Sequence, residues 1–131
     1  MAPAAHNITI YCGTTVDADN MTFTYRIAGQ EVDLTGYSAR SQARRKDGSV
    51  LFDLSSDDGS ITLGGTAGTI VFNLSAQQTS TLWSDELAPF GSVGGIDTYL
   101  AGKWDLELTS PAGRVVRLLQ GKVLLSPETT L

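Results

Sequence analysis

The fold is decided by the stretch Lys103-Trp104-Asp105-Leu106-Glu107-Leu108-Thr109. Its apolar side chains alternate with polar ones, which is the period of a β-strand with one buried face. We therefore expect a central strand that turns its tryptophan inward. The same alternation recurs in four shorter sets, namely Met21/Phe23/Tyr25/Ile27, Val50/Phe52/Leu54, Ile61/Leu63 and Ile70/Phe72/Leu74. Residues 114–125 are apolar on both faces, and Gly121 predicts a bend or bulge in that strand.

Turn residues separate these segments at short intervals. Asp47-Gly48-Ser49 and Asp58-Gly59-Ser60 are two hairpin signals of one type, and Asp33 or Thr35 is expected to bond the local backbone of a third turn. Residues 75–83 are the one helical candidate, with Ser75 as its cap. Turns at this spacing favour an all-β sandwich or barrel.

The composition excludes several classes of function. The chain has 131 residues, among them one histidine and one cysteine, and its net charge is −5. A zinc site needs about four nitrogen or sulfur ligands, so we expect no metal, no cofactor and no disulfide framework. An acidic chain does not attract nucleic acid, and no apolar run approaches the ~20 residues that span a bilayer. His6 has no motif around it, so we expect no catalysis and no enzyme.

The chain is predicted to hold one domain. Residues 1–6 are expected to be an N-terminal arm, and residues 7–131 a single β-sandwich domain with a long glycine-rich loop at 84–102. Long loops are often functional, so the loop's apolar side chains are candidate partner contacts. They are Leu87, Phe90, Val93, Ile96 and Tyr99.

A local run of basic residues gives two further candidates. Arg40 and Arg44 alternate with Ala39, Ser41 and Ala43, which predicts a strand with a small inner face and a charged outer face. The run indicates either an exposed sheet face or protected edge, or a contact surface for an acidic neighbour.

Several sequence blocks, taken in order, resemble the immunoglobulin-like domain of phage tail and baseplate proteins, including the N-terminal domain of baseplate upper proteins. The blocks are residues 32–40, 42–45, 58–65, 68–72, 104–108, 113–123 and 126–128. The resemblance implies an immunoglobulin-like β-sandwich of about 7–9 antiparallel strands with one short helical turn. Residues 84–100 depart from it, since the family passes almost directly from the helical turn to the strand.

The resemblance implies a bacteriophage virion structural protein of the tail, neck or baseplate. It would be an adaptor or fibre-docking subunit, a homo-oligomer or ring subunit that contacts other virion proteins, assembled in the host cytoplasm. The alternative is a carbohydrate-binding module of a phage receptor-binding apparatus, in which Trp83, Phe90 or Tyr99 stacks on sugar rings.

Overall fold

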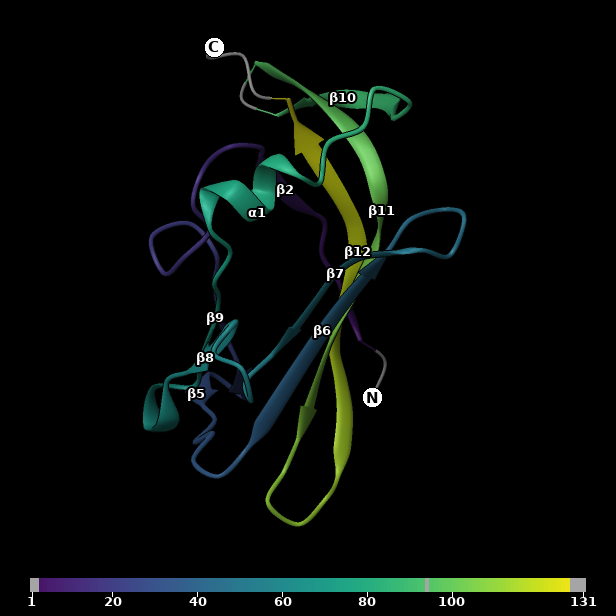
Figure 1. The fold of residues 1–131 in the computed structure, drawn as a ribbon. Coiled ribbons are helices and arrows are strands. Elements are labelled where there is room, and N and C mark those ends of the chain that lie inside the picture. The colour runs from purple at the N-terminus through teal and green to yellow at the C-terminus, as the bar shows by residue number, and fades with distance from the viewer. Residues whose placement is uncertain (1–2, 94, 128–131) are drawn as a thin grey trace.

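The structure is a computed structural model that describes residues 3–93 and 95–127. Two β-sheets face each other, so the predicted all-β sandwich class is confirmed (Figure 1). The large sheet runs in the order β1-β12-β11-β6-β7, with β2 also paired to β12 and β10 to β11. Its strands are β1 (Ala4–Ala5), β2 (Ile8–Tyr11), β6 (Ser38–Arg44), β7 (Val50–Ser55), β10 (Ala88–Val93), β11 (Ile96–Thr109) and β12 (Val115–Ser126).

The small sheet has the order β3-β9-β8 and covers one face of the large sheet. Its strands are β3 (Thr22–Thr24), β8 (Ile61–Leu63) and β9 (Thr69–Phe72), and a separate ribbon pairs β4 (Arg26–Ile27) with β5 (Gln30–Glu31). The helical elements are the 3-10 turn η1 (Gly65–Ala67) and the helix α1 (Ala76–Ser80). Ser75 caps α1 through a reciprocal hydrogen-bonded box with Gln78, as its sequence predicted.

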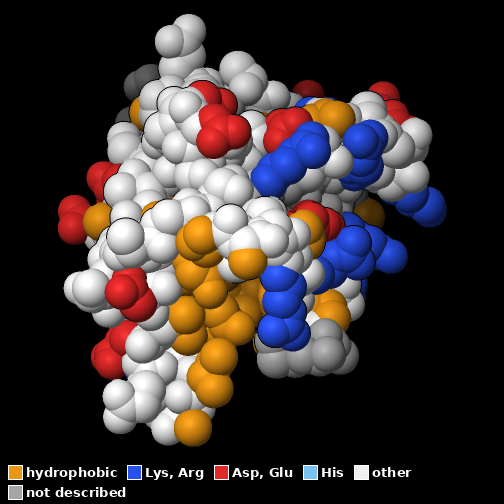
Figure 2. Space-filling view, turned by 90° about the horizontal axis from the view of Figure 1, so that it is seen from below, with side chains coloured by type: hydrophobic (Ala, Val, Ile, Leu, Met, Phe, Trp, Pro, Cys, Tyr) orange, Lys and Arg blue, Asp and Glu red, His pale blue; other side chains and the backbone are white. Residues whose placement is uncertain are grey.

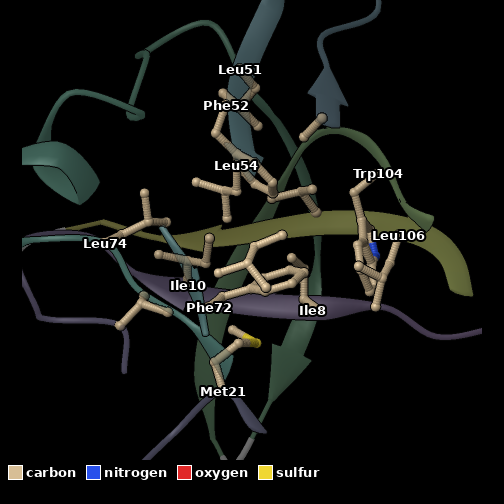
Figure 3. Close-up of a cluster of buried hydrophobic side chains, with 14 of the residues drawn as sticks. Ile8, Ile10, Met21, Leu51, Phe52, Leu54, Phe72, Leu74, Trp104 and Leu106 are labelled. Atoms are coloured by element: carbon tan, nitrogen blue, oxygen red, sulfur yellow. The ribbon is translucent and has the colours of Figure 1, made fainter. Parts of the chain in front are cut away.

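The core lies between the two sheets, and Figure 3 shows part of it, with Phe72 in the middle of the cluster and Trp104 at one side. Trp104 is 3% exposed, and β11 lies between β12 and β6, so the prediction of a central strand with an inward tryptophan is confirmed. Phe23 stacks on Trp104 with ring centroids 5.7 Å apart, and Phe72 meets the same ring edge-on at 5.8 Å. These contacts join β3 and β9 of the small sheet to the middle of the large one.

Two alternating sets are only partly buried, and local geometry explains both. Val50 is 44% exposed, because the pairing of β6 with β7 shifts register between Ala43 and Arg44. Leu51 and Phe52 are consequently both buried. Ile27 is 59% exposed because β4 and β5 form a ribbon of their own, outside both sheets.

The turn and glycine predictions need two corrections. Asp47-Gly48-Ser49 closes the β6–β7 hairpin, but Asp58-Gly59-Ser60 carries the chain from the large sheet to β8 in the small one and is no hairpin. Gly121 pairs with Trp104 in regular register, so no bulge occurs there. A side chain at Gly121 would collide with the backbone of His6, whose carbonyl oxygen lies 1.9 Å from a Cβ built at this position.

The N-terminal segment is docked where the sequence predicted an arm. Ala4 and Ala5 pair in parallel with Leu119 and Gln120 of β12, and β2 continues this parallel pairing farther along the same strand. The expected all-antiparallel sandwich is therefore wrong at this edge. The indole Nε1 of Trp104 donates a hydrogen bond of 2.9 Å to the carbonyl of His6, which holds residues 4–6 on the sheet.

Candidate functional site

The segment predicted as a loop at 84–102 is mostly a β-hairpin, which corrects that prediction. β10 pairs antiparallel with the start of β11 from Ala88↔Leu100 to Val93↔Ile96. The register shifts between Pro89 and Gly91, which leaves Phe90 as the extra residue of a bulge. A bulge re-aims the side chain at its position. The hairpin extends the large sheet at one end of the molecule (Figure 1).

The hairpin presents two of the five predicted apolar contacts to solvent. Phe90 and Ile96 are each 46% exposed. Leu87 and Tyr99 are half-buried. Leu87 packs against the core, so only part of its side chain is open to a partner. Val93 lies in β10, but its side chain falls outside the described part of the structure.

The aromatic residues of this region do not form a flat platform for a sugar. Trp83 and Tyr99 meet edge-to-face at 5.0 Å and 85°, and both are half-buried. The Trp83 indole Nε1 donates a 3.0 Å hydrogen bond to Asp85. The Phe90 ring has the Nζ of Lys122 5.7 Å from its centroid. This arrangement favours packing and cation–π contact over stacking on a pyranose ring.

The two predicted arginines lie on one face of β6 but differ in their partners. The alternation is confirmed, because Ala39, Ser41 and Ala43 are buried and both arginines are exposed. Since β6 lies between β11 and β7, the charged residues belong to an exposed sheet face, and the alternative of a protected edge is wrong.

Asp53 neutralises Arg40, whereas Arg44 contacts only uncharged groups among the hydrogen bonds of the described residues. The Arg40 guanidinium lies 3.1 Å from the Asp53 carboxylate, and this hydrogen bond and charge lower the pKa of Asp53. Arg44 donates to the Gln42 side chain at 3.1 Å and to the Gly48 carbonyl at 2.8 Å. Arg44 therefore keeps its charge available for a partner.

A groove of about 330 Å³ opens between the edges of the two sheets. It is lined mainly by apolar and aromatic side chains, namely those of Ala4, His6, Phe23, Thr24, Tyr25, Arg26, Leu118 and Leu119. The sequence did not reveal this groove, although Phe23 and Tyr25 alternate like core residues. Phe23 and Tyr25 are only half-buried. Their burial depends on where the N-terminal segment lies, and the alternation of residues does not indicate this.

Residues 3–93 and 95–127 contain no group of three or more His, Cys, Asp or Glu side chains placed to hold a metal ion. Cys12 is buried. Within the same ranges, no helix is long and apolar enough to cross a membrane.

Comparisons with known proteins assign no family. No protein-family model and no curated protein matches the chain. Among solved structures, extracellular domains 3–5 of Drosophila OTK are similar over 94% of this chain at 15% identity and a TM-score of 0.34. The chain spans 37% of that structure's length.

Proposed function

We propose that this protein is a non-enzymatic structural subunit of a bacteriophage virion, located in the tail, neck or baseplate. In this proposal the β-sandwich is a rigid adaptor that attaches to copies of itself and to other virion proteins. The sequence blocks that resemble phage tail and baseplate domains support the virion role. The geometry supports attachment through contacts between proteins, because the exposed features are strand edges and apolar side chains.

The observation that carries the proposal is the β10–β11 hairpin with its two exposed apolar residues. Phe90 sits at a bulge and Ile96 begins β11, and each exposes nearly half of its surface. Large apolar and aromatic side chains are enriched at the centres of protein interfaces, where loss of water contributes most to affinity. The family that the sequence resembles lacks this segment, so we assign it to a partner-specific contact.

The test is whether the chain is present in purified virions and whether the hairpin is needed for its incorporation. Mass spectrometry of virions from the phage or induced prophage that encodes the chain should detect it at a defined copy number. A Phe90→Ser/Ile96→Ser double variant should fold and yet fall at least about tenfold in incorporation, as expected when interface anchors are lost. Absence of the wild-type chain from virions overturns the proposed function.

Ile27→Ser is the matched control for the hairpin. Ile27 is 59% exposed on the separate β4–β5 ribbon, so its replacement removes a similar apolar surface from a different place. We expect normal incorporation of this variant. If the hairpin variant is incorporated to the same extent as Ile27→Ser, the hairpin is not the attachment site.

A further inference from the structure

Three exposed cations form a row across the outer face of the large sheet. The strand register places Lys103 of β11 directly opposite Arg44 of β6 on one side and Lys122 of β12 on the other. All three side chains are exposed, and neighbouring strands are about 4.8 Å apart, so three positive charges lie within roughly 10 Å. Like charges directly opposite each other destabilise a sheet. The row therefore works against the stability of the isolated domain.

The acidic residues of this face do not neutralise the row. Farther along the same strands, Asp105 and Glu107 are bridged by Arg117, at 3.6 and 3.7 Å, and Asp53 is bridged by Arg40. Among the described residues, none of the three cations of the row forms an ion pair. The face thus divides into a neutralised half and a cationic half.

The cationic half continues into the β6–β7 turn and ends in apolar groups. Arg45 and Lys46 follow Arg44 directly. The backbone of Arg45 packs closely on Gly102, because a Cβ built at Gly102 would lie 3.3 Å from the Cα of Arg45. Val50, opposite Arg44, is 44% exposed at one end of the row, and Phe90 lies beside Lys122 at the other. A cationic strip between exposed apolar side chains is suited to a protein surface that carries carboxylates.

The chain itself carries acidic side chains on two loops that connect the large sheet to the small one. Both loops are tied to the residues that follow β9. One loop is anchored by the Val16↔Leu74 bridge and holds Asp17 and Asp19. The other holds Asp57 and Asp58 and is anchored where Asn73 Nδ2 donates to the Gly59 carbonyl at 3.1 Å.

These charges are unevenly distributed over the molecular surface. In the view from below, Lys and Arg gather at one side of the molecule (Figure 2). Most of the Asp and Glu side chains visible in this view lie elsewhere on the surface. The cationic row is on the outer face of the large sheet, whereas the two acidic loops lie where the chain crosses from the large sheet to the small one, between β2 and β3 and between β7 and β8.

We propose that the row Arg44–Lys103–Lys122 of one copy binds the acidic loops around Asp17 and Asp58 of a second copy. This contact joins two different surfaces, so it is head-to-tail and generates a ring where the rotation closes or a fibre where it does not. The inference rests on the proposed role as a subunit that contacts copies of itself, and it specifies the surfaces. A protein partner is favoured over nucleic acid because the chain carries a net charge of −5 and the row is bordered by apolar side chains.

A charge-exchange experiment on the full chain tests the contact. Sedimentation velocity should show self-association at about 0.1 M salt that weakens at about 0.5 M salt, because exposed charges are screened. Lys103→Glu/Lys122→Glu and Asp57→Lys/Asp58→Lys should each weaken self-association at least about tenfold. An equimolar mixture of the two variants should associate again, since the reversed row of one then faces the reversed loop of the other.

Controls make each outcome decisive. Arg114→Glu changes an exposed cation in the β11–β12 turn and should associate like the wild type. A monomeric wild type at both salt concentrations, reversed variants that associate normally, or a mixture that stays monomeric overturns the proposed contact. A fluorescent DNA duplex is titrated in parallel, and DNA binding without self-association also overturns it. If the charge exchange fails while the chain is found in virions, only this contact is wrong and the proposed function stands.

Discussion

At the residue scale, Gly121 is the position that lets the start of the chain lie on its last strand. The His6 amide donates to the Gln120 carbonyl at 2.8 Å, and the Lys122 amide donates to the Asn7 side chain at 3.0 Å. A Cβ at Gly121 would occupy the space of the His6 carbonyl, which also accepts the Trp104 hydrogen bond. The glycine is thus required for close approach of two backbones, not for an unusual φ.

Gly121→Ala should therefore destabilise the domain by about 2–3 kcal/mol, the sum expected for two or three lost hydrogen bonds. Urea denaturation followed by tryptophan fluorescence measures this change, and displacement of His6 should also expose Trp104 and shift its emission to longer wavelength. Gly91→Ala is the control, because nothing lies within 4 Å of a Cβ at Gly91. Equal stability of the two variants would show that residues 4–6 do not hold the sheet together.

At the element scale, the two Asp-Gly-Ser turns share their chemistry but not their place in the fold. Oδ1 of Asp47 accepts from the backbone amide of Ser49 at 2.9 Å, and Asp58 accepts in the same way from Ser60. The serine side chain donates to the same carboxylate in both turns. Local sequence therefore predicted that the chain turns at both places, but the hairpin predicted at Asp58 is wrong, because the sheet that the following strand joins depends on the packing of the whole domain.

These turns give a pH dependence of stability with a definite sign. Hydrogen bonds from Ser49 and Ser60 lower the pKa of Asp47 and Asp58 below the ordinary value of 3.8. Because the folded state holds these protons less tightly, their contribution to stability is present above pH 3.8 and is lost as the pH falls through the lower folded-state values. Asp47→Asn/Asp58→Asn should flatten this loss in urea denaturation between about pH 5 and pH 2. A variant with the wild-type slope would assign the acid sensitivity to Asp33 and Asp53 instead.

The β10–β11 hairpin shows where prediction of elements from sequence stops. Pro89, Gly91 and Gly95 are poor strand formers, so residues 88–96 have the composition of a loop. Residues 88–93 form a strand because β11 extends beyond β6 and offers them its free edge. The sequence nevertheless named Phe90 and Ile96 as candidate contacts, and both are exposed, since an apolar residue in a glycine-rich segment has little local core to join.

At the scale of the whole molecule, the sequence predicted the layers but not how the chain closes. Alternation at 104–108 and the turn spacing carry the sandwich class, because both are local properties. Parallel pairing of Ala4 with Leu119 and of Ile8 with Val123 joins residues 115 positions apart and leaves no local signal. The cationic row was missed for the same reason: Lys103 and Lys122 are isolated in sequence and become neighbours of Arg44 only through register.

Repulsion within the cationic row should lower the free energy of unfolding of the isolated domain. Lys103 faces a like charge on both sides, so Lys103→Thr removes two repulsions and introduces a better strand former. We expect a gain of about 0.5 kcal/mol in the free energy of unfolding, together with weaker self-association, measured by urea denaturation and sedimentation of the same samples. Arg114→Thr, in the β11–β12 turn, should change neither quantity. Loss of stability on Lys103→Thr would mean that the three charges do not repel across the strands, and the destabilisation argument for a partner surface at this face would then fail.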